Sequence, residues 1–455
     1  MLSIKKININ IIILILLGLT LRVILFNLYT KHNNYKIPID SNQYNEIASK
    51  LAEKGNFLNA DNTPNFFRLP GYPIFMAVIY KIFGKNQTTM LFIQIIISLL
   101  IIYLAFILSN QIFHNTLTSK ITALIFTIHP GIILFSGLQA SESIFIIFLL
   151  LFLIFLFNGI NKNKIFYFIF SGIFIGIAGL TRNVGEYLFL GSIFAILLLS
   201  KEKLLLKIKH IITIFLPYFS IISIWFIRNY ILTGFIFLHT LTGQHFLRYN
   251  AVHILMDINN CTWESPHQEL FKNRNNTIKK LEQKTHRVLT EIEQDRIALK
   301  LAYNIINQNK LIALKDAIKQ IFITCFTPYS FMFLNLPPGI LFNQHTSTIT
   351  KIKYYLTNTI KYPIIIPFII LDILIDLILL IGFLFFIINA IKHKNLFNIS
   401  IVLLFFTLIL ISITLSYGCA RLRIPAEVFI ILIASFGLAK FLYKFEKIND
   451  KRINL

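Results

Sequence analysis

Charged residues are scarce in this chain of 455 residues: only 14% are Asp, Glu, Lys or Arg, whereas 56% are hydrophobic. The mean hydropathy is +0.70. A soluble domain typically contains about 25% charged residues. The apolar residues also form long runs rather than short alternating strands. Low charge and long apolar runs exclude a soluble globular protein and predict an all-α protein that crosses a membrane several times.

Cysteine is rarer still, with three residues, Cys261, Cys325 and Cys419, which lie far apart and form no C-x-x-C pair. This spacing excludes a disulfide framework and a cysteine zinc site. The first apolar run follows Lys5 and Lys6 and is not closed by a small-x-small cleavage site. We therefore expect this run to be a membrane span rather than a removed signal peptide.

Acidic residues are few as well, 20 against 43 Lys and Arg, which gives a formal net charge of +23. The chain has no basic domain with a DNA- or RNA-binding pattern, so we expect no nucleic-acid partner. Positive residues are enriched in cytoplasmic loops and beside anionic lipid head groups. The surplus of Lys and Arg therefore predicts contact with membrane lipids.

About ten apolar windows are candidates to cross roughly 30 Å of hydrocarbon, and we predict 10 to 13 transmembrane helices. The uncertainty comes from short or merging windows and from residues 311–361. There the aromatic, proline-containing stretch 323–339 is either an interfacial or re-entrant element or an extra span. The windows are residues 8–29, 89–108, 121–138, 143–158, 165–181, 186–200, 211–232, 362–391, 399–417 and 424–443.

Lysine-rich stretches set the predicted orientation. Four of them fall on one side if ten spans alternate, and that side is then cytoplasmic: residues 161–164, 201–210, 392–394 and 444–452. The outer face receives residues 30–88, a first extracytoplasmic loop with amphipathic helices over 42–54 and 72–83. It also receives residues 233–361, a large extracytoplasmic segment with helical patterning. Residues 1–455 are treated as one integral membrane domain.

Ionisable residues gather at the predicted outer ends of the spans. Because Lys and Arg normally accumulate on the cytoplasmic side, outer arginines need another explanation. Arginine binds phosphate through two parallel hydrogen bonds, and a neighbouring carboxylate can move a proton. Singly, each Arg fits an interfacial side chain and Asp40 fits a helix cap. Their joint placement favours a phosphate-binding site: Asp40, Arg68, Glu142, Arg182, Arg228, Arg421 and Arg423.

Several segments, in order, resemble those of bacterial GT-C glycosyltransferases, which include protein O-mannosyltransferases and the aminoarabinose transferase that modifies lipid A. The resemblance covers roughly residues 8–440. Asp40 opens "DSNQYNEIASKLAEKGNF" and Arg68 lies in "FRLPGYPIFMAVIYKIFG". The later matching segments are "HPGIILFSGLQASESIF", "GLTRNVG", "WFIRNYILTGFIFLHTLTGQHFLRYN" and "RLRIPAEVFIILIASFGL".

The resemblance implies a GT-C fold and transfer of a sugar, with inversion, from a polyprenyl-phosphate donor at the outer face of the inner (cytoplasmic) membrane. It implies that Asp40 is the general base and Glu142 a second acid. The acceptor is a lipid A-type glycolipid as in lipopolysaccharide, another glycan or a protein. The arginines Arg68, Arg182, Arg228, Arg421 and Arg423 are expected to hold the donor phosphate. Tyr44, Tyr72, His245 and Tyr249 are expected to line the substrate site.

Ser41 departs from the pattern, because some relatives carry a second acid directly after the first. We therefore expect no metal ligands and no definite cofactor, although a role for a divalent cation stays open. Two other functions also stay open: a transporter or flippase of lipid-linked sugars, and an inactive scaffold of the same fold. A transporter is expected to show paired halves or charges near the bilayer midplane. Gly172 and Gly176, four residues apart, predict close helix packing within one bundle rather than a dimer contact.

Overall fold

The computed structural model describes residues 9–31, 39–332, 357, 366–412, 415 and 417–453. These parts of the chain are almost wholly helical, and within them the only β-type pairing is an isolated bridge between Leu58 and Pro64. The predicted all-α class is therefore confirmed. Residues 333–339 of the stretch 323–339, whose position was left open, lie outside the described residues.

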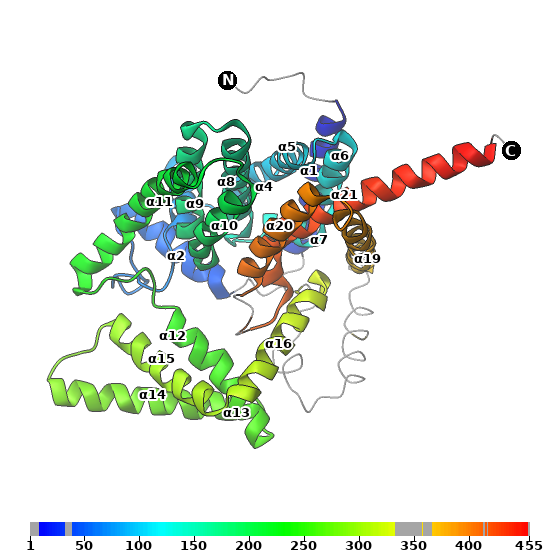
Figure 1. The fold of residues 1–455 in the computed structure, drawn as a ribbon. Helices are drawn as coiled ribbons and strands as arrows, with labels where there is room; N and C mark the ends of the chain where they lie inside the picture. The colour runs from blue at the N-terminus through cyan, green and yellow to red at the C-terminus, as the bar shows by residue number, and fades with distance from the viewer. Residues whose placement is uncertain are drawn as a thin grey trace.

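The helices before residue 234 form the larger part of a bundle, shown in blue to green in Figure 1. They are α1 (Ile9–Lys31), α2 (Ile39–Lys54), α3 (Gly71–Phe83), α4 (Gln87–Ser98), α5 (Leu100–Phe113), α6 (Thr116–Ile128), α7 (Pro130–Ser136), α8 (Glu142–Lys162), α9 (Ile165–Thr181), the 3-10 helix η1 (Asn183–Tyr187), α10 (Leu188–Leu199) and α11 (Leu204–Thr233).

A layer of more polar helices follows and lies beside one end of the bundle (Figure 1). It contains α12 (Thr242–His245), the π-helix η2 (Phe246–Ala251), α13 (Val252–Asn259), α14 (Glu264–Thr285) and α15 (Glu291–Gln308). Helix α16 (Lys310–Phe326) leads back to the bundle and ends before the 3-10 helix η3 (Tyr329–Met332). The bundle is completed by α19 (Ile366–Ala390), α20 (Lys394–Ser412) and α21 (Ala420–Ile453).

Within the described residues, seven helices are long and apolar enough to cross a membrane, or eight if the bent pair α6–α7 forms one span. The shorter apolar helices Ile165–Thr181 and Asn183–Leu199 coincide with two further predicted windows. Every one of the ten windows thus overlaps an apolar helix. The chain is a multi-pass membrane protein, and the exact number of spans stays a prediction.

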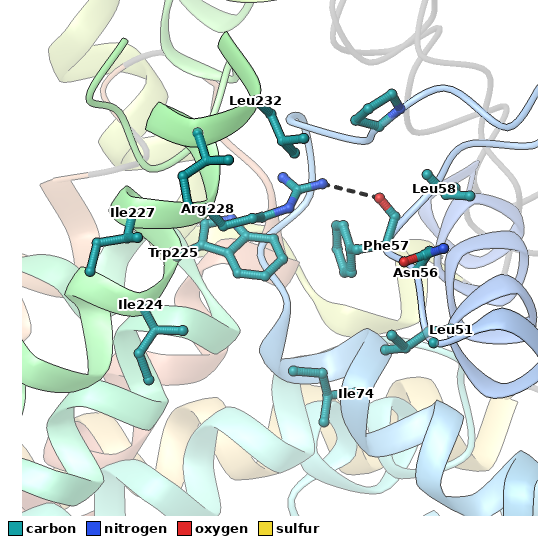
Figure 2. Close-up of a pocket in the computed structure, with 13 residues that line it drawn as sticks. Leu51, Asn56, Phe57, Leu58, Ile74, Ile224, Trp225, Ile227, Arg228 and Leu232 are labelled. Carbon is teal, nitrogen blue, oxygen red and sulfur yellow. Dashed lines mark hydrogen bonds between the residues drawn. The ribbon is translucent and has the colours of Figure 1, made fainter. Parts of the chain in front are cut away.

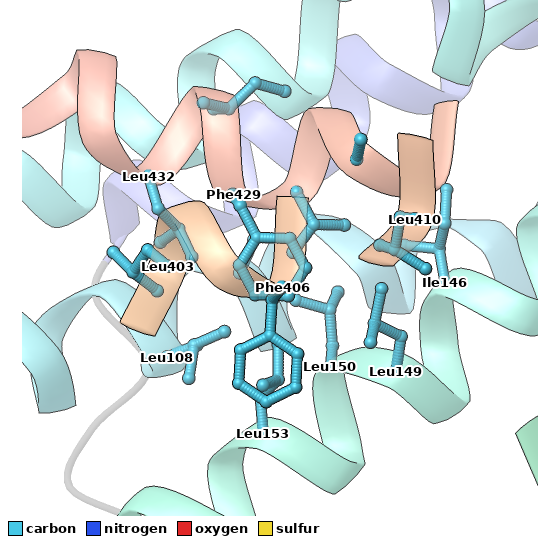
Figure 3. Close-up of a cluster of buried hydrophobic side chains, with 14 of the residues drawn as sticks. Leu108, Ile146, Leu149, Leu150, Leu153, Leu403, Phe406, Leu410, Phe429 and Leu432 are labelled. Carbon is cyan, nitrogen blue, oxygen red and sulfur yellow. The ribbon is translucent and has the colours of Figure 1, made fainter. Parts of the chain in front are cut away.

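The core of the bundle is built by α5, α8, α20 and α21 (Figure 3). The rings of Phe406 on α20 and Phe429 on α21 stack with their centroids 5.2 Å apart. Among the candidate spans, α8 and α21 are the most enclosed, with 72% and 78% of their central windows buried. Because both helices are embedded in close-packed neighbours, the side chains at their first turns are held in fixed positions.

Gly172 lies where α9 contacts α11. A Cβ atom at Gly172 would lie 2.3 Å from the carbonyl oxygen of Ile214 and 2.5 Å from Cγ of Pro217. A Cβ at Gly176 would meet Ile221 at 3.0 Å. The small residues therefore serve close packing inside the bundle, which confirms the prediction.

Candidate active site

Asp40 lies in the first turn of α2, with about a quarter of its side chain exposed (28%). The next residue, Ser41, is fully buried and donates a hydrogen bond to the carbonyl oxygen of Gln139 at 2.9 Å, which fixes the start of the helix. Arg68 donates from Nη2 to one carboxylate oxygen of Asp40. Arg421 donates from Nη1 to the other oxygen at 2.8 Å. Both oxygens of this acid are thus paired with arginine.

Glu142 is the first residue of α8 and is completely buried. Its Oε1 accepts hydrogen bonds from Nη1 of Arg182 and from Nε of Arg421, each at 2.5 Å. Arg182 also contacts the hydroxyl of Ser141 at 3.3 Å. A carboxylate at a helix N-terminus is additionally favoured by the helix dipole. The second predicted acid therefore lies in the same cluster as the first.

Arg421 joins the two acids, because its guanidinium contacts Asp40 and Glu142 at once. The cluster holds two carboxylates and three guanidinium groups, so its formal charge is −2 + 3 = +1. It draws on the first turn of α2, the loop before α3, the start of α8, the end of α9 and the start of α21. Five of the predicted site residues meet here: Asp40, Arg68, Glu142, Arg182 and Arg421.

Gln94 supports the turn that precedes Glu142, a role that was not predicted from the sequence. Its amide nitrogen donates to the carbonyl oxygens of Ser136 at 2.9 Å and Leu138 at 2.7 Å. Its own oxygen accepts from the Tyr72 hydroxyl at 2.7 Å. Tyr72 is wholly buried, so it supports the site from behind rather than lining it. A buried Gln in an apolar helix was the one available hint.

Tyr44 lies between Tyr72 and the charged cluster. Its ring meets the Tyr72 ring edge to face at 4.9 Å, and the Arg68 guanidinium carbon lies 5.1 Å from its centroid. Arg68 also donates from Nε to Oε1 of Gln43 at 2.8 Å. The orientation of Arg68 is therefore fixed by an aromatic ring, an amide and a carboxylate together.

The charges around Asp40 dominate its acidity. Burial alone would raise the pKa of its carboxyl, but Arg421 and Arg68 outweigh burial and hold the pKa at about 2. His245 lies near enough for both charges to act on it. Burial, and then Arg68, lower the pKa of His245 to about 4. Asp40 is thus an ionised and strongly paired carboxylate, and His245 is a neutral imidazole at pH 7.

Arg228 lies elsewhere, near the C-terminal end of α11 (Figure 2). It donates to the carbonyl oxygens of Asn65 at 3.0 Å and Phe57 at 3.1 Å, and its guanidinium lies over the Trp225 ring at 4.6 Å. Beside it is an apolar hollow of about 570 Å³ lined by Leu51, Ile74 and Ile224 among others. The structure therefore places Arg228 as a clamp on the 57–65 loop, apart from the Asp40 cluster.

Arg423 also lies apart, although it follows Arg421 by only two residues. It donates to Oε1 of Glu427 at 2.6 Å, to Oδ1 of Asp376 at 3.3 Å and to the carbonyl oxygen of Cys325. Its guanidinium lies over the Tyr329 ring at 4.9 Å. Two residues of helix correspond to about 200° of rotation, so Arg421 and Arg423 necessarily face different directions.

His245 and Tyr249 lie next to each other in the polar layer, with ring centroids 5.5 Å apart. The charges of Asp40 and Arg68 act on both side chains, which places the two rings beside the charged cluster. Their predicted role in lining the substrate site stays a proposal.

No group of three or more His, Cys, Asp or Glu side chains suitable for a metal ion occurs among the described residues. The two acids of the cluster are paired with three arginines, and the hydroxyl of Ser41 is turned to the carbonyl of Gln139. A divalent cation would have to displace guanidinium groups from a cluster that already carries a positive charge. The residues present therefore do not fit a metal ion, and no step below uses one.

Comparison with known proteins shows what part of the chain resembles a known family and which solved structures share its fold. Residues 64–225 match the family model described as dolichyl-phosphate-mannose-protein mannosyltransferase. No curated protein sequence matches the chain. The oligosaccharyltransferase AglB from Archaeoglobus fulgidus, in complex with an inhibitory peptide and a dolichol-phosphate, superposes with a TM-score of 0.53 at 14% identity. That likeness covers 98% of this chain and 51% of AglB. At 14% identity this likeness shows a shared fold, and the family match is confined to residues 64–225.

Two further structures are similar to this chain. The A. fulgidus oligosaccharyltransferase tethered to an acceptor peptide gives a TM-score of 0.51 at 14% identity, over 96% of this chain and 49% of the other. ArnT from Cupriavidus metallidurans, bound to undecaprenyl phosphate, gives 0.40 at 13% identity, over 94% and 77%. The chain spans about half the length of the archaeal enzymes. The two likenesses to the archaeal oligosaccharyltransferase, both with TM-scores above 0.5, confirm the predicted GT-C fold. The matched family segment contains Arg68, Glu142 and Arg182 but not Asp40 or Arg421.

Proposed function

We propose that this protein transfers a sugar from a polyprenyl-phosphate donor to a hydroxyl group of an acceptor at the outer face of the cytoplasmic membrane. The observation that carries the proposal is the Arg421 bridge, which brings a partly exposed acid, Asp40, and a buried acid, Glu142, into one cluster with Arg68 and Arg182. The family description names a dolichyl-phosphate sugar, and AglB was solved with a dolichol-phosphate, which supports this donor class.

The charge of the cluster suits such a donor. A sugar joined to a polyprenyl phosphate is a phosphodiester with one negative charge, which matches the net +1 of the cluster. When the sugar leaves, the phosphate becomes a monoester whose second ionisation has a pKa of about 6. The developing charge is therefore attracted more strongly than the charge of the bound donor. Interactions that strengthen in this way accelerate the reaction.

In the proposed step, the acceptor oxygen attacks the anomeric carbon from the side opposite the phosphate. The bond from the anomeric carbon to the phosphate oxygen breaks, and its electron pair stays on the phosphate. The proton of the acceptor hydroxyl passes to the carboxylate of Asp40. A single displacement of this kind inverts the anomeric centre. Asp40 suits the role of base because it is the partly exposed acid of the cluster.

The low pKa of Asp40 makes it a weak base while both arginines pair with it. A donor phosphate that binds Arg68 and Arg421 would draw these guanidinium groups toward itself, and the pKa of Asp40 would rise. Proton acceptance would then be favoured only when the donor is in place. Glu142 stays buried and keeps Arg182 and Arg421 oriented toward the phosphate.

The test is transfer by purified protein from a polyprenyl-phosphate sugar to candidate acceptors. The Asp40→Asn variant should lose transfer by about 10²–10⁴-fold, the usual contribution of a general base, and should still bind undecaprenyl phosphate. Asp61→Asn is the matched control, because Asp61 belongs to the same predicted outer segment, residues 30–88, and among the described residues its carboxylate accepts hydrogen bonds from Thr63 alone. Full transfer by Asp40→Asn would remove Asp40 from the role of base.

A further inference from the structure

The π-helix η2 presents an arginine that the charged cluster does not use. Leu247 and Ala251 of this helix are fully buried in a core with Val252 and Met256, so the intervening Arg248 is exposed. π-Helical turns are rare and occur frequently at functional sites. The wide turn therefore marks Arg248 as a candidate ligand-binding residue.

Arg248 contacts two aromatic rings, and a third ring packs against one of them. Its guanidinium carbon lies 5.9 Å from the centroid of Tyr249 and 5.8 Å from that of Trp263, at the start of α14. Tyr249 contacts Tyr417, with centroids 4.6 Å apart. Trp263 stacks on His267 at 4.1 Å. One cation and several flat ring faces therefore gather at one place.

Arg248 makes no ion pair with a carboxylate in the part of the chain that the structure describes. This contrasts with Arg68, Arg182 and Arg421, each of which pairs with an acid. The uncompensated charge acts on its neighbours: burial and then Arg248 lower the pKa of His267. An exposed cation beside aromatic rings is suited to an anion that also carries a ring or an apolar face.

The position of this group relates it to the proposed reaction. Asn250 donates to the carbonyl oxygen of Leu415 at 3.2 Å, so η2 is joined to the segment that leads into α21 and Arg421. The ring of Tyr249 contacts that of Tyr417, four residues before Arg421, with centroids 4.6 Å apart. Arg248 therefore borders the charged cluster from the side of the polar layer, while the donor phosphate is assigned to the other arginines.

We propose that Arg248, with the rings of Tyr249, Trp263 and Tyr417, binds an anionic saccharide, a sugar bearing a phosphate or a carboxylate, on the acceptor side of the site. The aromatic faces contact the C–H face of the sugar ring, and the guanidinium pairs with the anion. The assignment to the acceptor rests on the proposed function, whereas the ligand class follows from these side chains alone.

Trp263 makes the proposal measurable without any activity assay. The chain has two tryptophans. The full-length Trp225→Phe protein therefore reports emission from Trp263 alone, and glucose 6-phosphate, glucuronate, glucose and inorganic phosphate serve as probes. We expect the two anionic sugars to change the emission at concentrations at least tenfold below those needed for glucose or inorganic phosphate. Arg248→Gln should weaken the anionic sugars by about tenfold or more, the loss of one charge-assisted hydrogen bond.

Arg296→Gln is the matched control, because Arg296 is exposed in the same layer and also lies over an aromatic ring, that of Phe235 at 4.9 Å. It should bind the probes like the parent. Equal responses to inorganic phosphate and to glucose 6-phosphate, or no loss in Arg248→Gln, would overturn the proposal.

A second experiment distinguishes the donor phosphate from a phosphate on the acceptor sugar. If Arg248 held the donor phosphate instead, Arg248→Gln would also weaken the binding of undecaprenyl phosphate. We expect that affinity to stay within about twofold, and a parallel loss would overturn the assignment to the acceptor. Because binding is measured directly, this outcome is independent of whether Asp40 is the base.

Discussion

Asp40 shows how a single side chain is tuned by its partners. Its carboxyl has an ordinary pKa of 3.8, which Arg421 and Arg68 lower to about 2 despite burial. A lowered pKa means that these ion pairs stabilise the folded protein fully above pH 3.8 and that this stability is lost as the pH falls toward 2. The same tuning determines how the proposed activity depends on pH.

Replacement of Arg68 should shift the pH at which kcat/KM falls on the acid side. In the native protein Asp40 stays ionised to about pH 2, so it contributes no fall in kcat/KM between pH 4 and 8. Arg68→Gln takes away one of its two partners, and the pKa of Asp40 should rise toward its ordinary value. The acid limb of the kcat/KM profile should then shift upward by about one unit, which a pH series of transfer rates measures.

Arg287→Gln is the control for this pH series. Arg287 likewise lowers the pKa of a carboxyl, that of Glu293, to about 2, but the pair lies in the polar layer away from Asp40. Its profile should match that of the native protein. An unshifted limb in Arg68→Gln with transfer retained would contradict the assignment of the base.

Glu142 is expected to matter for folding as much as for chemistry. It is completely buried and balances Arg182 and Arg421. Glu142→Gln would leave two guanidinium groups with less compensation, and removal of one partner of a buried ion pair typically costs about 3–5 kcal/mol. Thermal unfolding in detergent should show a clear loss. Glu53→Gln, an exposed acid on α2, should change stability by less than about 0.5 kcal/mol.

At the scale of helices, the contact between α9 and α11 depends on one glycine. A Cβ at Gly172 would lie 2.3 Å from the backbone oxygen of Ile214, which cannot move without shifting α11. Gly172→Ala should therefore lower the free energy of unfolding by about 1–3 kcal/mol. Gly137→Ala offers the comparison, since its Cβ would meet no atom closer than 3.8 Å. Equal unfolding temperatures for both variants would show that α11 can shift to accommodate the added Cβ without loss of stability.

Helices were predictable from the sequence because lipid leaves an apolar segment no alternative to internal hydrogen bonds. The convergence of Asp40, Glu142 and Arg421 was predictable only in outline, from their shared position at outer span ends. Their pairing joins residues up to 381 positions apart. No local pattern specifies such a contact, since it depends on how the whole bundle packs.

The sequence alone does not separate Arg228 and Arg423 from the three arginines of the cluster. In sequence, an arginine at the end of a span looks the same whether it binds a ligand or holds a loop in place. In the structure, Arg228 donates hydrogen bonds to the carbonyl oxygens of residues 57 and 65. The π-helix around Arg248 was likewise not predicted, because π-helical turns are rare. The positions of the apolar helices could thus be predicted from the sequence, whereas the partners of individual side chains became known only from the folded structure.

For the whole molecule, the proposed function requires that the polar layer and the charged cluster face the outside of the cell. The orientation rests on the positive-inside rule, and labelling of single cysteines by a membrane-impermeant maleimide tests it directly. The background is a protein in which Cys261, Cys325 and Cys419 are replaced by Ser. Glu142 is unsuitable as a labelling position because it is buried, so exposed positions are used.

Glu53→Cys on α2 and Lys284→Cys on α14 should react in intact cells, because both positions are exposed and belong to the predicted outer segments. Lys162→Cys and Lys201→Cys lie in the lysine-rich turns and should react only after the membrane is opened. Reaction in the reverse order would place Asp40 and Arg421 on the cytoplasmic side. A donor and an acceptor at the outer face could then not be the substrates, even if transfer itself were observed with purified protein.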